Sequence, residues 1–408
     1  MVSSRACHYR MPCTVVNPEI PAELAREAHQ QLRHPQLAET LRRHLGELPQ
    51  PATASEIGTD LHPDCQMLSH SLRHLGDAGL SVTQYFTIAL QQFHAAEQII
   101  RRHPVERNAL KFLDFACGYG RLLNFLVHSL PRDNIQAAEI MPGAVRHVQD
   151  RYGVKAWQST EDPEDFRPGQ RYDMIWVASL FSHLPEELFV RWLSRLHELL
   201  SDDGILCFTV HDEALLPADM KLPGSGLLYI EGSENADLDP AIYGTSFVSE
   251  DFVRRALDRA LGKDRPYRRF PRLIAYEQDV YMIGRDGRQT PTSMSELRHG
   301  LRGWVDGCRI DEEGVVHLHG WAASMDGDDI EGVEIMLGAQ SRFIRTGEPR
   351  PEVARVLGKP ELADCGWSCS MPLPAGDAEA YLTVSARGRL DPPALLYAAP
   401  ITHAVKRG

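Results

Sequence analysis

The sequence predicts an α/β protein with a doubly wound, largely parallel sheet, preceded by a helical region and followed by a small β-sandwich. Three observations support this order. Residues 21–103 place charged and apolar residues at three- and four-residue spacing, as in surface helices. Over 112–285, short apolar runs alternate with amphipathic segments, which is typical of strand–helix units. Beyond residue 300, short partly alternating runs are separated by Gly, Asp and Pro turns, as in antiparallel strands.

The length of 408 residues is sufficient for two or three domains with sizeable cores. The changes in pattern divide the chain into four predicted parts. These are a helical cap region at 1–107, the α/β domain at 108–285, a linker at 286–300 and the β-sandwich domain at 301–408.

Composition and charge exclude several function classes. The net charge is −13 and no run of Lys and Arg is long, so a nucleic-acid partner is not expected. No apolar run approaches about 18 residues, so no membrane span is expected. The first 16 residues lack the apolar core of a signal peptide, and the eight cysteines are scattered without a CxxC pair. We therefore expect a cytoplasmic protein with reduced thiols and no metal site.

In the helical region, the pattern predicts a break at 76–79 and a longer helix from Val82 that ends before Pro104. Tyr85 and Phe86 lie early in this helix. They are candidates to cover a bound cofactor, although aromatic residues at helical spacing also fill cores.

The central stretch of the α/β part begins with the apolar run 112–115, which reads as a buried strand. A turn containing Gly118 and Gly120 follows. Apolar residues then recur at helical spacing over 122–130, and Pro131 ends the helix. This strand–turn–helix order suits a nucleotide cofactor, because glycine allows close backbone approach and a helix N-terminus offers free N–H groups. A glycine turn of purely structural kind is the alternative.

The turn resembles motif I of the class I S-adenosylmethionine-dependent methyltransferases. That motif places an acidic residue two positions before three alternating glycines, and here Ala116 replaces the first glycine. The resemblance implies a Rossmann-like methyltransferase domain that binds S-adenosylmethionine. It also implies cofactor-binding roles for Asp114, Ala116, Cys117, Gly118 and Gly120. A nicotinamide fingerprint, which needs G-x-G-x-x-G/A, fits worse.

The second predicted strand, 134–140, carries Glu139 near its end, 25 residues after Asp114. An acidic side chain at this strand tip can accept hydrogen bonds from both ribose hydroxyls. The resemblance therefore implies that Glu139 binds the cofactor's ribose, and Ile140 is included among the cofactor-binding residues. A surface glutamate at a strand end is the alternative.

Two further segments carry the resemblance. The loop after the third predicted strand, 154–159, is where such enzymes contact adenine, which implies roles for Ser159 and Thr160. The fourth strand, 171–179, leads into the turn 180–185, which is similar to a turn that lies against the cofactor in methyltransferases of small molecules and sugars. Ser179 and Leu180 are therefore added to the cofactor-binding residues.

Two histidines are candidates for the general base. His183 follows the fourth predicted strand and His211 follows the fifth, 205–210, so both are expected on loops at the carboxyl ends of central strands. Histidine suits proton removal near neutral pH. We assign the base to His211, oriented or replaced by Asp212 or Glu213, and place His183 against cofactor or substrate. Satisfied polar residues at strand ends are the alternative.

The remaining segments are expected to complete the sheet and add an accessory domain. A variable stretch to about residue 240 is expected to form the substrate wall, and Ser249 begins a helix. Residues 272–285 are read as two strands with a turn near Glu277, or as one bent strand. The β-sandwich resembles, through Gly320–Trp321, 350–353 and Gly366–Trp367, a module appended to bacterial glycan-biosynthesis enzymes. A packing or dimerisation domain, giving a homo-oligomer, is the alternative.

Together these features predict an S-adenosylmethionine-dependent methyltransferase that O-methylates a sugar, glycan or other small hydroxylated molecule. Residues 178–181 lack the NPPY-type turn of adenine and glutamine methyltransferases, and the double-glutamate loop of arginine methyltransferases is absent from the sequence. Two other hypotheses remain. One is a non-catalytic cofactor-binding or scaffold protein in glycan assembly, and the other is a nicotinamide-dependent oxidoreductase.

Overall fold

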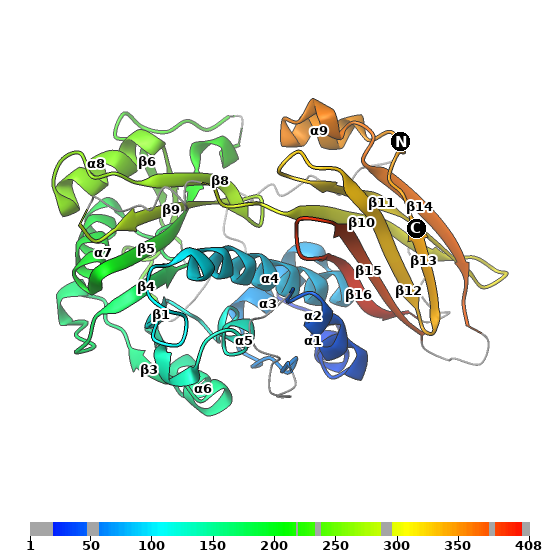
Figure 1. Cartoon of the computed structure of the whole chain (residues 1–408), viewed down its shortest axis with the longest axis horizontal. Helices are drawn as coiled ribbons and strands as arrows, with labels where there is room; N and C mark the ends of the chain where they lie inside the picture. Colours follow the sequence, from blue (N-terminus) through cyan, green and yellow to red (C-terminus); the bar gives the residue numbers. More distant parts are fainter. Residues whose placement is uncertain are drawn as a thin grey trace.

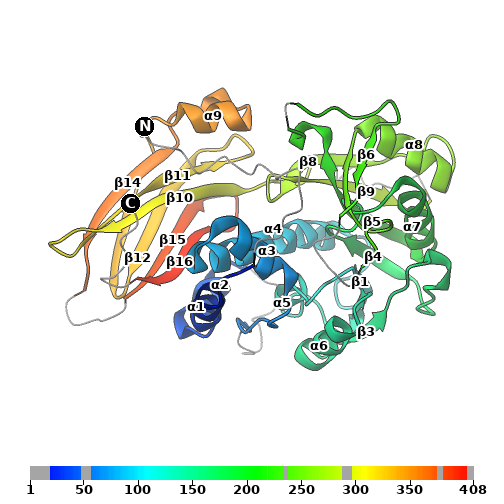
Figure 2. The same ribbon diagram turned by 180° about the vertical axis from the view of Figure 1, so that it is seen from behind.

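The computed structural model describes residues 19–46, 57–217, 219–232, 238–286, 296–374 and 380–401. A mixed sheet flanked by helices forms one end of the molecule and two antiparallel sheets form the other, with the N-terminal helices lying between them (Figure 1; seen from behind in Figure 2). The predicted fold class is confirmed. Among the described residues, no helix is both long and apolar enough to cross a membrane.

Helices dominate the described N-terminal part. They are α1 (Ala22–Leu32), α2 (Pro35–Arg43), α3 (Gln66–Leu75) and α4 (Ala78–Arg102). The predicted break between the last two is shorter than expected. Gly76 ends α3 in a left-handed conformation (φ +61°), and the Asp77 side chain accepts a 2.9 Å hydrogen bond from Leu80 N, so α4 already begins at Ala78.

The mixed sheet contains the following strands: β1 (Phe112–Phe115), β2 (Ile135–Glu139), β3 (Lys155–Gln158), β4 (Tyr172–Val177), β5 (Leu200–Asp212), β6 (Leu227–Ile230), β7 (Thr245–Val248), β8 (Arg268–Ile274) and β9 (Gln278–Gly284). The order β3-β2-β1-β4-β5 is parallel, and β9 runs antiparallel to β5 with β8 beside it. The strand order reverses between β1 and β4, which opens a crevice at their carboxyl ends.

Helices cover both faces of this sheet. They are α5 (Leu123–Leu126), α6 (Pro142–Tyr152), α7 (Glu186–Glu198) and α8 (Glu250–Leu261). One core joins α4, α5 and α6 to one face, and a second joins α7 and α8 to the other. The α5 helix is shorter than the predicted 122–130, because the chain continues in turns after Val127. The C-terminal strands β8 and β9 confirm the two-strand reading of 272–285.

The C-terminal region contains β10 (Leu301–Ile310), β11 (Val315–Ser324), β12 (Ile330–Leu337), β13 (Gln340–Ile344), α9 (Pro351–Leu357), β14 (Gly366–Pro372), β15 (Ala380–Gly388) and β16 (Ala394–Ile401). The sheets β10-β11-β14 and β13-β12-β15-β16 share one apolar core, as expected for a sandwich. The helix α9 and the strand β16 were not among the elements predicted from the sequence.

Helix α4 connects the sandwich to the mixed sheet. On one side, Thr87 Oγ1 donates to Leu395 O of β16 at 3.0 Å, and Thr83 Oγ1 accepts from Ala398 N at 3.0 Å. On the other side, the ring of Phe93 packs 6.0 Å from that of Phe125 in α5. Within the predicted linker, 287–295 lie outside the described residues, and Arg298 N donates to the Gln98 side chain of α4 at 2.8 Å.

Candidate cofactor-binding site

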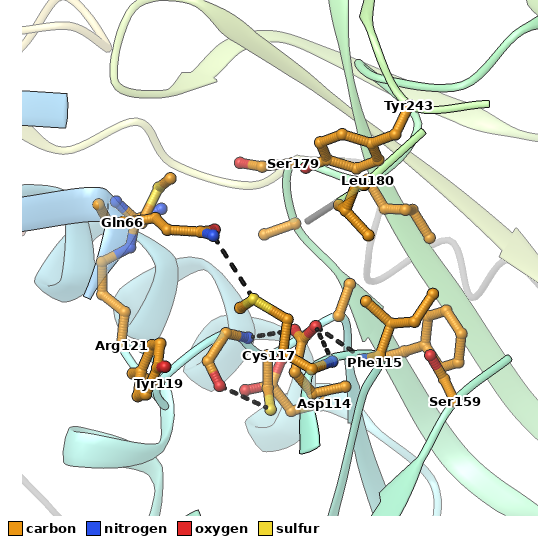
Figure 3. A pocket seen from close by; sticks show the side chains of 18 of the residues that line it. Gln66, Asp114, Phe115, Cys117, Tyr119, Arg121, Ser159, Ser179, Leu180 and Tyr243 are labelled. Atoms are coloured by element: carbon orange, nitrogen blue, oxygen red, sulfur yellow. Dashed lines mark hydrogen bonds between the residues drawn. The ribbon is translucent and has the colours of Figure 1, made fainter. Parts of the chain in front are cut away.

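A pocket opens at the carboxyl ends of β1, β2 and β4 (Figure 3). The predicted cofactor residues that line it are Asp114, Ala116, Cys117, Gly118, Glu139, Ile140, Ser159, Thr160, Ser179 and Leu180. These residues come from four separate segments, which the fold brings to one place. Their role in binding a cofactor stays a prediction.

Gly120 is the one predicted cofactor residue that is not among the lining residues. Its backbone is left-handed (φ +85°), and a Cβ atom there would lie 2.3 Å from Cε2 of Tyr152. Gly118 is also left-handed (φ +55°), but a Cβ atom there would meet nothing within 4 Å. Gly120 therefore allows helix packing, whereas Gly118 leaves open space beside the pocket.

Ala116 also adopts a left-handed conformation, with φ +58°. This conformation brings the Cβ atom of an L-residue too close to the following carbonyl oxygen, at a cost of about 1–2 kcal/mol. This strain explains why glycine suits this position of the motif. Alanine at the same position has an energetic cost, because it must adopt the left-handed conformation.

We expect Ala116→Gly to be neutral or to raise the free energy of unfolding by up to about 1 kcal/mol. Relief of the strain exceeds or balances the greater chain entropy that glycine loses on folding. The control is Ala144→Gly in α6, where glycine is expected to cost about 1 kcal/mol. Urea unfolding of both variants tests the prediction, and equal destabilisation would contradict it.

The carboxylate of Glu139 is fixed by backbone N–H groups at the end of β2. Its Oε2 accepts from Gly118 N at 2.8 Å, and its Oε1 accepts from Ile140 N at 2.7 Å. Burial raises the pKa of Glu139, and these backbone donors act in the opposite direction. The side chain thus links the glycine turn to β2 at the edge of the pocket.

Asp114 has a buried carboxyl group that lacks a hydrogen-bond partner on Oδ2 among the described residues. Burial, together with the nearby charge of Glu139, raises the pKa of Asp114 to about 8. A buried carboxylate beside a pocket fits a ligand that brings positive charge to it. S-adenosylmethionine carries two such groups, an ammonium and a sulfonium, so the residues present fit this cofactor.

The two candidate catalytic histidines lie outside the lining residues. His211 was expected on a loop, but this expectation is wrong, because β5 continues to Asp212 and His211 is buried between β7 and β9. The ring of His183 stacks on Tyr243 at 4.7 Å, and its Nδ1 lies 2.6 Å from Gly244 O. Tyr243 therefore lines the pocket where His183 was expected to do so. A general-base role for either histidine stays a prediction.

Other lining residues were not identified from the sequence. They include Cys65, Gln66 and Met67 around the start of α3, Gln92 of α4, and Leu238, Ile242 and Tyr243 from the segment before β7. Tyr85 also lines the pocket, whereas Phe86 packs in the core. One signal in the sequence could have identified Gln92 as a pocket residue. It is a polar residue on a largely apolar helix face, and it lies one heptad after Tyr85.

Similarity to known proteins agrees with this geometry. A family model described as a methyltransferase domain matches residues 113–206. Two curated relatives are both malonyl-[acyl-carrier protein] O-methyltransferases. The one from Bacillus cereus is 27% identical over 138 residues (34% of this chain, 51% of the relative), and the one from Acetivibrio thermocellus is 27% identical over 104 residues (25% and 36%). The chain thus spans about half the length of the first relative.

Among solved structures, the chain is similar to a 1,6-didemethyltoxoflavin-N1-methyltransferase from Burkholderia thailandensis. The two share 18% identity with a TM-score of 0.33, over 47% of this chain and 76% of the other. The matched segment 113–206 spans the motif turn, the fixed Glu139 and the strands β1 to β4. This part of the chain is therefore a methyltransferase domain.

Proposed function

We propose that the protein is an S-adenosylmethionine-dependent methyltransferase that acts on an oxygen atom of a small molecule. The observation that carries the proposal is the buried carboxyl of Asp114, whose Oδ2 has no hydrogen-bond partner among the described residues and which lines the pocket beside the fixed carboxylate of Glu139. This pair suits a ligand with cationic groups at one end and a ribose at the other.

In this proposal, different lining residues bind different parts of the cofactor. Asp114 pairs with its positive charge, and Glu139 accepts hydrogen bonds from the ribose hydroxyls. Ser159 and Thr160 lie on the adenine side, after β3. When bound, S-adenosylmethionine supplies a methyl group on positively charged sulfur. The pocket's remaining task is to align the acceptor in line with the methyl–sulfur bond and to exclude water.

An oxygen acceptor is favoured by two lines of reasoning. The sequence pattern favours a sugar, glycan or other small hydroxylated molecule, and the curated relatives are named as O-methyltransferases of malonyl-[acyl-carrier protein]. In this proposal the enzyme acts in the cytoplasm, and the β-sandwich contacts a second copy of the chain or a glycan-assembly partner.

Transfer of radiolabelled methyl groups tests the proposal. The protein is incubated with methyl-labelled S-adenosylmethionine and the low-molecular-mass fraction of a cell extract. We expect many labelled product molecules per protein molecule, and almost none with Asp114→Asn. Tight cofactor binding without any turnover would instead favour the non-catalytic hypothesis.

A further inference from the structure

We define the acceptor side of the pocket as five lining residues that come from elements other than β1, β2 and β3. It consists of Met67 from α3, Tyr85 and Gln92 from α4, Ser179 after β4, and Tyr243. In Figure 3, Ser179 and Tyr243 lie across the pocket from Asp114 and Cys117. We take this side as the one from which an acceptor approaches the methyl group.

Gln92 is the most informative of them. Its side chain is only 3% exposed, and its Nε2 has no hydrogen-bond partner among the described residues. A buried amide that remains unsatisfied costs free energy, so a ligand oxygen that accepts from it is stabilising. The neighbouring Gln91 is satisfied, because its Oε1 accepts from Ala275 N at 2.8 Å.

Ser179 provides a second oriented donor. Its backbone is held in a left-handed conformation (φ +61°), and its N–H donates to Thr209 Oγ1 at 2.8 Å. Its Oγ accepts from Gln278 Nε2 at 2.8 Å. Because that bond uses a lone pair of Oγ, the hydroxyl proton remains to donate to a group in the pocket. The strained backbone is held from two sides, as expected where a side chain must point in one direction.

The two donors, the Gln92 amide and the Ser179 hydroxyl, are neutral groups near pH 7. Burial raises the pKa of the Tyr85 hydroxyl well above its usual value, so it remains protonated. The acidic residues that line the pocket, Asp114, Glu139 and Glu161, come from the ends of β1 and β2 and from the loop after β3. Donors without an adjacent base suit an oxygen that is already negatively charged, whereas a hydroxyl would need its proton removed.

We propose that the acceptor is a carboxylate, bound by Gln92 Nε2 and the Ser179 hydroxyl, and that the product is a methyl ester. This inference rests on the proposed methyltransferase function. A carboxylate oxygen attacks the methyl carbon and forms the C–O bond. The methyl–sulfur bond breaks, its electron pair stays on sulfur, and the neutral thioether S-adenosylhomocysteine is released. Charge balances without a proton transfer.

The chemistry of the methylated product distinguishes a carboxylate acceptor from a hydroxyl acceptor. Methyl esters release methanol in alkali, whereas methyl ethers resist it. We use two probe pairs that differ only in the acceptor group, octanoate with 1-octanol and glucuronate with glucose, together with the low-molecular-mass extract. We expect the methyl label in the acid of a probe pair or in the extract. We also expect alkali to release this label as methanol. Alkali-stable label would overturn the inference while leaving the methyltransferase function intact. Absence of any label despite S-adenosylhomocysteine binding would also overturn it.

Variants test the two donors separately from cofactor binding. Gln92→Leu and Ser179→Ala are each expected to lower kcat/KM for the acid by about 10- to 100-fold, the effect of losing a hydrogen bond to a charged group. The affinity of Gln92→Leu for S-adenosylhomocysteine is expected to stay unchanged. Thr87→Val, on the face of α4 that contacts β16, is the matched control and should leave kcat/KM unchanged. A loss of S-adenosylhomocysteine affinity in Gln92→Leu would assign the amide to the cofactor's carboxylate and overturn the inference.

Two measurements distinguish binding of the acceptor by Gln92 from a purely structural role of this side chain. With S-adenosylmethionine at saturating concentration throughout, the rate with a carboxylate acceptor is expected to be flat between about pH 6 and pH 9, because a carboxyl group is ionised throughout this range. Gln92→Glu is expected to reduce turnover further than Gln92→Leu, because a second negative charge would repel the acceptor. A rate that rises steadily with pH, or a gain of activity in Gln92→Glu, would indicate a hydroxyl acceptor and contradict the inference.

Discussion

Asp114→Asn is expected to lose at least about 100-fold in affinity for S-adenosylmethionine, as for the loss of a charged partner inside a buried site. The carboxyl is buried, faces the pocket and lacks a partner on Oδ2 among the described residues. The variant keeps the shape of the side chain and removes its charge. Isothermal titration measures the loss, and an unchanged affinity would show that Asp114 does not pair with the ligand.

The same variant is expected to be more stable than the native protein without ligand. Folding raises the pKa of Asp114 from 3.8 to about 8, so the folded state holds this proton more tightly than the unfolded state. The free energy of unfolding contributed by this group therefore falls as the pH rises from about 4 to about 8. Asparagine removes this penalty. We expect a higher unfolding temperature for Asp114→Asn at pH 8 and a smaller difference at pH 5.

Binding should also depend on pH through this group. At pH 7 the Asp114 carboxyl is protonated in the free protein, because its pKa is about 8. A cationic ligand favours the ionised form, so binding at pH 7 releases a proton and the affinity increases as the pH approaches 8. Titration in buffers of different ionisation enthalpy measures this proton. As a control, Asp114→Asn is expected to bind without releasing this proton. If the variant still releases a proton on binding, the proton comes from another group.

Glu139→Ala and Gly118→Val are the second pair of substitutions with large expected effects. Glu139 holds the glycine turn through Gly118 N and presents its carboxylate at the pocket. Its loss removes both the ribose acceptor and the support of the turn. Valine at position 118 would place its side chain in space that the structure leaves open for a ligand, in a left-handed conformation that β-branched residues avoid.

We expect each of these variants to lower the affinity for S-adenosylhomocysteine by about 100-fold or more. The matched control is Glu164→Ala, which removes an exposed carboxylate paired with Arg191 and should bind normally. Circular dichroism and thermal unfolding check that the β-sandwich remains folded. Native affinity in both Glu139→Ala and Gly118→Val would refute the assignment of the site.

The side of the pocket at the ends of β1 and β2 was predictable because its signals are local. The apolar strand, the glycine turn and the acidic strand end follow from neighbouring residues, and the structure places Asp114, Gly118 and Glu139 together. The alternating strand and helix patterns predicted a doubly wound sheet, and the structure contains one. These features depend on backbone conformation and burial, which short stretches of sequence specify strongly.

The positions of Met67, Gln92 and Tyr243 in the pocket were not predictable, because these residues come from distant elements. Gln92 reaches the pocket only because α4 packs between the sheet and the sandwich. His211 was misplaced because its position depends on how far β5 extends along β9, and pairing length is a tertiary property. The strand β16 was missed because β15 and α4 bury it, so it lacks the alternation that marks a half-exposed strand.

Isothermal titration of the purified protein with S-adenosylmethionine, S-adenosylhomocysteine and NAD tests the central claim most directly. We predict micromolar binding of the first two ligands, release of a proton at pH 7 and no binding of NAD. Binding of NAD alone, or of none of the three, would contradict the assignment of this pocket to a methyl donor.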